Sequence, residues 1–182
     1  MISLGLDLSL VSSGVVAIEK NKVVVQQLVK SKKNGEKPID ELNRIRKIVQ
    51  EIEVITNDCN PDVVVIENLA FMARNTTALT QLAGLSYFCR AMLADCGIPF
   101  YMCAPTTLKK FVTGRGNSPK DQIMLDVYKR WKFNPTNPDI ADAYGLAKIG
   151  LSIVELTDTN NKKQKECTEL LKKQMYTYGP TR

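Results

Sequence analysis

Four acidic residues stand where the surrounding sequence makes a carboxylate costly or gives it a defined direction. Asp7 interrupts the apolar strand predicted for residues 2–8, and Glu67 follows the apolar, β-branched run 63–66. A buried carboxylate loses its hydration and is stable only when it is paired or binds a cation. Asp139 and Asp142 are three residues apart in a predicted helix and therefore share one of its faces. We expect the two strand acids to share a cation, with the helical acids facing them.

Most of these acids also have a plainer explanation. Asp139 falls in the first turn of its helix, where the helix dipole stabilises an anion without any bound ligand. Asp7 and Glu67 would be satisfied by a buried arginine, although no arginine lies near either residue in the sequence. Asp142 is harder to explain in this way, because the apolar residues of its helix predict that it is buried.

The absence of histidine restricts the chemistry that these acids can perform. It excludes histidine-dependent catalytic triads and most zinc sites. A donor set made only of oxygen atoms suits Mg²⁺ or Mn²⁺. Four carboxylates would hold two such ions, which can activate water and stabilise the leaving oxygen of a phosphodiester without a histidine base. The sequence therefore predicts metal-dependent hydrolysis.

Positive charge is concentrated in three parts of the chain. The 25 Lys and Arg residues exceed the 19 Asp and Glu residues, which gives a net charge of +6 and a pI of about 9.0. Residues 30–47 carry seven basic and three acidic side chains, residues 105–132 seven and two, and residues 157–182 six and three. This balance favours a polyanionic partner. Any one block is equally well explained as a solvated helix face or a solubilising tail.

The hydrophobic pattern predicts a mixed α/β domain. Residues 2–8, 15–19 and 23–29 are predicted to form an antiparallel meander, with a turn at residues 12–14. An amphipathic helix from residue 39 to before residue 60 then leads to strand 63–66, which the crossover makes parallel to an earlier strand. A helix over 75–95, a strand over 99–103 and helices over 105–111, 119–131 and from 138 follow. We expect one domain over 1–156 and a basic extension over 157–182 that is helical or disordered.

Cysteine usage and hydropathy bear on the compartment. The five cysteines include no CxxC pair, which predicts reduced thiols in a reducing cytosol. No apolar run is long enough for a membrane span, and the first residues lack the pattern of a secretory signal. We expect a soluble, cytoplasmic protein.

Four ordered motifs resemble the RuvC-type Holliday junction resolvases, which have an RNase H-like fold. They are residues 4–14 (LGLDLSLVSSG), 65–75 (VIENLAFMARN), 104–120 (APTTLKKFVTGRGNSPK) and 138–143 (PDIADA). The resemblance covers residues 1–151 and implies an α/β fold with a mixed five-stranded sheet flanked by helices. Four motifs in one order are far more specific than any one of them.

The resemblance implies roles for individual residues. Asp7, Glu67, Asp139 and Asp142 would hold two Mg²⁺ or Mn²⁺ ions. Lys120, and either Lys109 or Lys110, would contact backbone phosphate, with Lys120 also supporting the scissile phosphate and Arg115 lying in the same basic stretch. Phe71 would wedge against an unstacked base, with core packing beside Met72 as the alternative. Arg74 would contact phosphate or be a solvated loop residue.

The resemblance also implies a homodimer that nicks branched DNA symmetrically during recombination or DNA processing. The helix over residues 75–95 is the expected contact, through Leu82, Leu85, Phe88, Cys89 and Met92, unless these side chains form internal core. Leu8-Ser9 stands where the family often has Pro-Gly, and residues 157–182 have no counterpart, as in relatives from viruses or phages. Two alternatives stay open, which are cleavage of structured RNA and branched-DNA binding without catalysis. A helicase partner is not identified.

Overall fold

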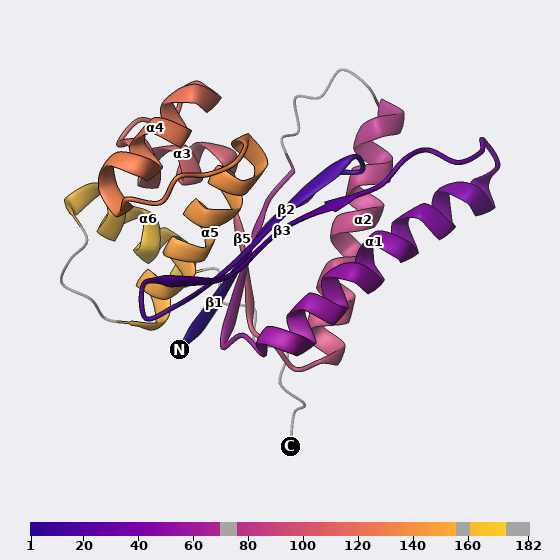
Figure 1. Cartoon of the computed structure of the whole chain (residues 1–182), viewed down its shortest axis with the longest axis horizontal. Coiled ribbons are helices and arrows are strands. Elements are labelled where there is room, and N and C mark those ends of the chain that lie inside the picture. Colours follow the sequence, from indigo (N-terminus) through magenta and orange to yellow (C-terminus); the bar gives the residue numbers. More distant parts are fainter. Residues whose placement is uncertain (70–75, 156–160, 174–182) are drawn as a thin grey trace.

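A five-stranded sheet runs through the middle of the molecule, with helices on both of its faces (Figure 1). The computed structural model describes residues 1–69, 76–155 and 161–173. The strands are β1 (Ile2–Asp7), β2 (Ser12–Glu19), β3 (Lys22–Lys30), β4 (Val63–Glu67) and β5 (Phe100–Cys103). The helices are α1 (Pro38–Cys59), α2 (Thr76–Asp95), α3 (Pro105–Thr113), α4 (Lys120–Trp131), α5 (Pro138–Val154) and α6 (Lys162–Lys172).

The strand order is β3-β2-β1-β4-β5. β1, β2 and β3 are antiparallel neighbours, β4 is parallel to β1, and β5 is parallel to β4. The predicted meander, the parallel crossover strand and the five-stranded mixed sheet are therefore confirmed. Because β1, β4 and β5 are parallel, they finish at one end of the sheet, where β3 also finishes and β2 begins. We call this the Asp7 end.

Two details of the first hairpin differ from the prediction. β1 finishes at Asp7, so this acid ends its strand instead of interrupting it, and residues 12–14 lie inside β2 instead of forming a turn. The turn lies earlier, where the Ser9 amide donates to the Ser13 hydroxyl over 3.0 Å and that hydroxyl donates to the Ser9 carbonyl over 2.8 Å. A serine side chain that bonds the backbone in this way replaces the ladder bonds of a strand.

The alternation of side chains divides the sheet residues between two cores. Leu4, Leu6, Val64 and Ile66 pack toward α1 and α2, as part of one buried cluster. Val63 and Val65 belong to a second cluster, which contains α5. Since neighbouring residues of a strand point to opposite faces, Asp7 and Glu67 lie on the α5 face.

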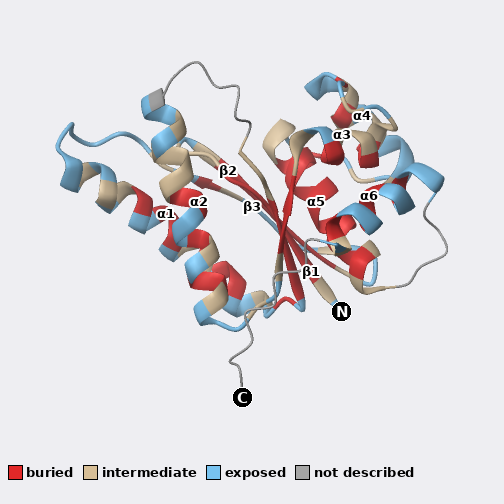
Figure 2. Cartoon of the chain, turned by 180° about the vertical axis from the view of Figure 1, so that it is seen from behind, coloured by how far each residue is buried: buried red, intermediate tan, exposed pale blue. Residues whose placement is uncertain are grey.

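Helix α5 lies unusually close to the sheet. A Cβ atom added to Gly5 of β1 would be 2.0 Å from the Ala143 carbonyl oxygen, and one added to Gly14 of β2 would be 2.2 Å from the Asp139 carbonyl oxygen. Glycine in a strand permits this backbone approach because it has no side chain. Helices α3, α4 and α6 cover the outer side of α5, which is buried along almost its whole length (Figure 2).

Helix α6 packs against α3 and α5 through buried Cys167 and Leu171. Two polar contacts hold it there, a Lys110–Glu166 ion pair of 3.0 Å and a hydrogen bond of 3.0 Å from the Lys163 ammonium to the Gly114 carbonyl. Part of the segment after residue 157 is therefore attached to the basic stretch between α3 and α4.

The five cysteines are free thiols, as the absence of close pairs predicted. Burial raises the pKa of the Cys89 thiol to about 12 and raises that of Cys103 further, so both are protonated core residues. In the described ranges, no helix combines the length and the apolar character that a membrane crossing requires.

The approach of α5 predicts the effect of a single methyl group. Gly5→Ala would place a side-chain carbon against the backbone of α5, and we expect it to lower the free energy of unfolding by about 3 kcal/mol and the melting temperature by roughly 6–12 °C. Gly84→Ala, in α2, is the matched control. Its added carbon would lie 3.5 Å from the side chain of Ile45 in α1, which is an ordinary van der Waals contact. We expect the control to be neutral or stabilising. Equal melting temperatures for the two variants, measured by circular dichroism, would contradict this account.

Candidate metal centre

Asp7 and Glu67 are brought together by the register of two parallel strands. Leu6 of β1 pairs with Ile66 of β4, so the next residue of each strand, an acid in both cases, comes at the Asp7 end on the same face. Asp7 is only 9% exposed, and Glu67 is half-buried. The Asp7 and Glu67 carboxyl groups are within hydrogen-bonding reach of each other. The two acids, sixty residues apart in the chain, therefore form one pair.

Burial dominates the electrostatics of this pair. Loss of hydration, the largest cause, and the negative charges of Glu67, Asp142 and Asp139 together raise the pKa of Asp7 to about 9. Burial also raises the pKa of Glu67, while the hydrogen bond from Asp7 and the charges of Lys120 and Lys109 oppose that change. Burial therefore favours a pair that carries less negative charge than two free carboxylates, and the two acids titrate together.

Asp142 faces the pair from α5. It is 6% exposed, and among the described residues its Oδ1 atom is buried with no hydrogen-bond partner. Burial and the charge of Glu67 raise its pKa to about 7, although Lys120 and Lys109 oppose the change. A buried carboxylate oxygen without a donor is unfavourable, and a bound cation would satisfy it.

Asp139 is partly exposed, with 27% of its side chain accessible. It lies in the first turn of α5, as predicted, and its carboxylate is 4.0 Å from the Lys120 ammonium. It is also close enough to raise the pKa of both Asp7 and Asp142. The structure thus brings all four predicted acids to the Asp7 end of the sheet, from β1, β4 and α5.

The two lysines that act on these acids come from neighbouring helices. Lys109 lies in α3 and Lys120 begins α4, and both lower the pKa values of Glu67 and Asp142. Lys110 has a different environment, since its ammonium pairs with Glu166 of α6. Arg115 is exposed in the α3–α4 loop, where its amide donates to the Thr113 hydroxyl over 3.1 Å. Of the alternatives Lys109 and Lys110, the structure places Lys109 beside the acids.

Phe71 and Arg74 lie outside the described residues. Their predicted contacts with a base and with phosphate stay predictions.

The donor chemistry of the site fits a hard divalent cation. Its ligands would be carboxylate oxygens, and mutual repulsion together with burial favours neutralisation by a positive ion. Among the residues that the structure describes, no three acidic or cysteine side chains have the arrangement of a ready-made metal cage. Asp7 and Glu67 form a hydrogen-bonded pair with two further carboxylates in electrostatic reach, so a cation that bound them would displace the proton of that hydrogen bond.

Two glycines are important for the site and were not recognised from the sequence. Gly5 and Gly14 allow the first half of α5 to touch β1 and β2, and without that contact Asp139 and Asp142 would be held away from Asp7. A glycine inside an apolar strand is a signal of close backbone approach. Gly5 carries that signal, but the sequence does not identify the segment that approaches it.

The chain is similar to known proteins over most of its length. The family model described as crossover junction endodeoxyribonuclease RuvC matches residues 3–150. The RuvC protein of Carboxydothermus hydrogenoformans is 30% identical over 151 residues, which cover 75% of this chain and 94% of that protein. That of Chlorobium phaeovibrioides is 30% identical over 110 residues, which cover 59% of this chain and only 58% of that protein.

Two solved structures resemble the fold. Thermus thermophilus RuvC, in complex with a Holliday junction substrate, has a TM-score of 0.69 and 19% identity, with 81% of this chain and 90% of that chain covered. The yeast mitochondrial Holliday junction resolvase Ydc2 has a TM-score of 0.60 and 15% identity, with 94% and 83% covered. The predicted RNase H-like, resolvase-type fold is therefore confirmed.

The pKa of Asp7 predicts how the stability of the metal-free protein depends on pH. Because folding raises this pKa from 3.8 to about 9, the folded state retains a proton that the unfolded chain releases. The resulting stabilisation is complete below the unfolded pKa and is lost as pH rises toward 9. Asp7→Asn removes this loss, and we expect it to raise the melting temperature in EDTA by roughly 5 °C at about pH 8, with little change near pH 4.

The control is Asp58→Asn, which changes an exposed carboxylate of α1. Its melting temperature should follow that of the wild type at both pH values. A gain for Asp7→Asn that is the same at acid and alkaline pH would contradict the proposed origin of the effect.

Proposed function

The chain belongs to the RuvC family of crossover junction endodeoxyribonucleases, and from this premise we propose that it is a divalent-metal-dependent nuclease that cuts four-way and related branched DNA. One observation carries the proposal. Asp7, Glu67, Asp139 and Asp142 come from three distant segments to one end of the sheet, where they are beside Lys109 and Lys120. Carboxylates next to lysines suit a reaction at a phosphodiester, since the acids would bind metal and the lysines would attract phosphate.

The four acids would bind two Mg²⁺ or Mn²⁺ ions, with Asp7 and Glu67 as the central ligands. Such ions, when bound, supply an activated water and stabilise the leaving oxygen. The residues of the chain prepare the site. Asp7 gives up the proton that it shares with Glu67, Asp142 contributes its unpartnered oxygen, and Lys120, 4.0 Å from Asp139, supports the scissile phosphate.

The DNA backbone would follow the basic surface of α3, α4 and their connecting loop. Lys109, Lys120 and Arg115 are the first contacts we propose, because Lys110 would have to leave its ion pair with Glu166. Phe71 follows Glu67 by four residues in the sequence, and we retain its role as a wedge against an unstacked base. Arg74, in the same segment, would contact phosphate.

The protein would act as a homodimer, because the two strands to be cut in a four-way junction are related by a two-fold axis. Of the α2 residues predicted to make the contact, Leu85, Cys89 and Met92 are buried in the core of the protomer and Leu82 is partly buried against it. Phe88 is 42% exposed and its neighbour Tyr87 65% exposed. We assign the dimer contact to this Tyr87–Phe88 surface, since exposed aromatic residues are typical of interfaces.

The proposed function also suggests the domain limits and the cellular compartment of the protein. Residues 1–156 would form the nuclease domain, and the lysines of residues 157–182 would add phosphate contacts. The protein would act in recombination and DNA repair in the cytoplasm of a bacterium or of a phage-infected host.

Cleavage by purified protein tests this function. We expect paired, symmetric nicks in a four-way DNA junction with Mg²⁺, none with EDTA, and little cutting of a linear duplex. Cutting only of an RNA hairpin would favour a ribonuclease, and junction binding without cutting at any metal concentration would favour a binding protein.

Asp142→Asn tests the role of the helical acids. It removes one anionic oxygen ligand and leaves the basic surface intact, so we expect junction cleavage to fall by about a hundredfold or more while junction binding stays within about twofold. Asp95→Asn, at the exposed end of α2, is the control and should cut like the wild type. Full cleavage by Asp142→Asn in a gel assay would remove this residue from the site.

Phe88→Glu tests the dimer. A buried, unpaired charge at a dimer contact is unfavourable, so we expect sedimentation velocity to give a monomer for this variant and a dimer for the wild type. Leu170→Glu is the control, because Leu170 is an exposed apolar residue of α6 away from α2. A dimer in both variants would exclude the Tyr87–Phe88 surface.

A further inference from the structure

A basic hollow lies at the end of β3, apart from the carboxylates. Four cationic side chains line it, those of Lys30, Lys32, Arg44 and Lys47, together with the polar residues Ser31, Asn34 and Asn43. Its volume is about 530 Å³. We call it the Arg44 hollow, and it belongs to the basic block 30–47.

The positive charge of the Arg44 hollow is only partly offset by the described residues around it. Within residues 1–69, 76–155 and 161–173, the ammonium groups of Lys30, Lys32 and Lys47 form no ion pair. Asp40 is the acid that lines the hollow, and its carboxylate already accepts the Lys37 amide at the start of α1 over 3.1 Å. Clustered lysines without internal partners repel one another, and an anionic ligand would relieve that repulsion.

Arg44 connects the hollow to the catalytic end of the sheet. Its guanidinium donates to the Ser31 hydroxyl over 2.9 Å and to the Leu10 carbonyl, three residues beyond Asp7. The strand register also places Lys30 near Asp7. Lys30 pairs with Ser12 of β2, and Gly14 of the same strand pairs with Asp7. The hollow therefore lies at the Asp7 end of the sheet, on the side of α1.

Lys109 and Lys120, the lysines near the acids, lie on the opposite face of the sheet from the Arg44 hollow. Lys109 and Lys120 come from α3 and α4, which cover the α5 face, whereas the start of α1 is across the sheet from them (Figure 1). Basic side chains thus flank the carboxylates on both sides. A polyanion that passed over the acids would reach one group and then the other.

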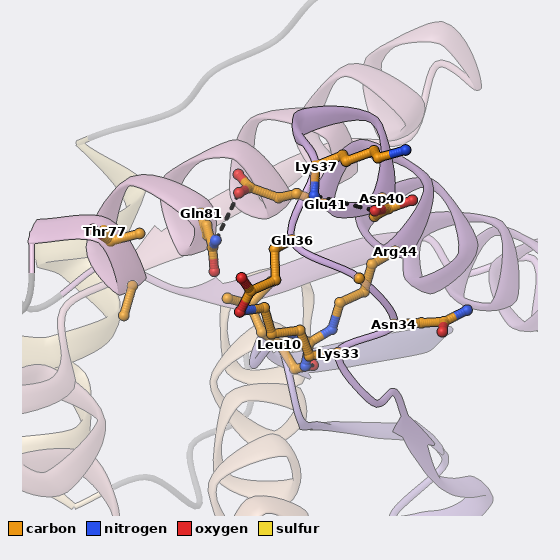
Figure 3. Close-up of a pocket in the computed structure, with 12 residues that line it drawn as sticks. Leu10, Lys33, Asn34, Glu36, Lys37, Asp40, Glu41, Arg44, Thr77 and Gln81 are labelled. Carbon is orange, nitrogen blue, oxygen red and sulfur yellow. Dashed lines mark hydrogen bonds and ion pairs between the residues drawn. The ribbon is translucent and has the colours of Figure 1, made fainter.

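The neighbouring pocket is less suited to an anion. It shares Asn34, Asp40 and Arg44 with the hollow, but Glu36 and Glu41 also line it (Figure 3). There Lys33 pairs with Glu36 over 3.1 Å, and the Gln81 amide donates to Glu41 over 2.7 Å. Its charges are balanced internally, so an anionic partner favours the Arg44 hollow.

We propose that the Arg44 hollow binds the phosphodiester backbone of a DNA arm that leads away from the cleavage site. The inference rests on the proposed function and adds the path of a second arm. Exposed lysines arranged around an open hollow suit an extended backbone, because such contacts depend on charge and position and read no base sequence. The arm would enter beside Lys30 and Lys32 and pass Lys47 along the first turns of α1.

Lys32→Ala/Lys47→Ala tests the proposal in the full-length protein. Affinity for a long-armed four-way junction is measured by fluorescence anisotropy at several salt concentrations in EDTA. We expect the double variant to bind about tenfold more weakly, with the slope of log affinity against log salt reduced by about 2. Lys20→Ala/Lys22→Ala is the control, because it removes two exposed lysines from the opposite end of the same hairpin. The control should retain the slope of the wild type.

Hydroxyl-radical footprinting locates the lost contacts. We expect the Lys32→Ala/Lys47→Ala protein to lose protection along one arm and to keep it at the crossover. A wild-type slope and footprint in this variant, in a protein that cuts the junction normally, would overturn the inference while leaving the proposed function intact. Equal losses in the control pair would also overturn it. If the wild-type protein bound no branched DNA, both proposals would fail.

Discussion

The repulsion among acids at one end of the sheet is the constraint on which the rest of the structure depends. Asp7 and Glu67 meet there with Asp142 and Asp139, and burial removes the water that would otherwise screen them. The protein without metal relieves this repulsion by raising the pKa of Asp7 and Glu67, which favours protonation of the pair, and by placing Lys109 and Lys120 nearby. These compensations are partial, because one oxygen of Asp142 has no partner among the described residues. The molecule thus maintains an arrangement that costs stability and favours a cation.

The architecture around the acids is built to keep them close. Gly5 and Gly14 let the backbone of α5 rest on β1 and β2, so two acids of a helix reach an acid at the end of a strand. Helices α3, α4 and α6 then cover the outer side of α5. Because α3 and α4 also carry Lys109 and Lys120, the same packing that buries α5 sets the distance between the acids and the cations that surround them.

The acidic residues that would bind metal and the basic residues that would attract phosphate lie in different parts of the surface. The acids lie at the centre of the Asp7 end, with Asp7 and Asp142 buried, whereas lysines lie on both sides of it, on α3 and α4 and around Arg44. In the proposed function a polyanion would be attracted over this wide surface, and only the segment that crossed the middle would meet the carboxylates. Specificity for branched DNA would then depend on the shape of the nucleic acid, because several arms must follow this surface together.

The sequence alone determined which residues could do chemistry and the local elements that carry them. Apolar periodicity identified the strands, the crossover and the helices, and the lack of histidine limited the donors to oxygen, because these are properties of short segments and of composition. Only the tertiary structure decided which of Lys109 and Lys110 faces the acids, which α2 residues belong to the core, and that Asp7 ends its strand. It also showed that Gly5 must be a glycine because the backbone of α5 packs directly against it. These outcomes depend on contacts between segments that are far apart in the sequence, and no local pattern encodes the distance at which two such segments pack.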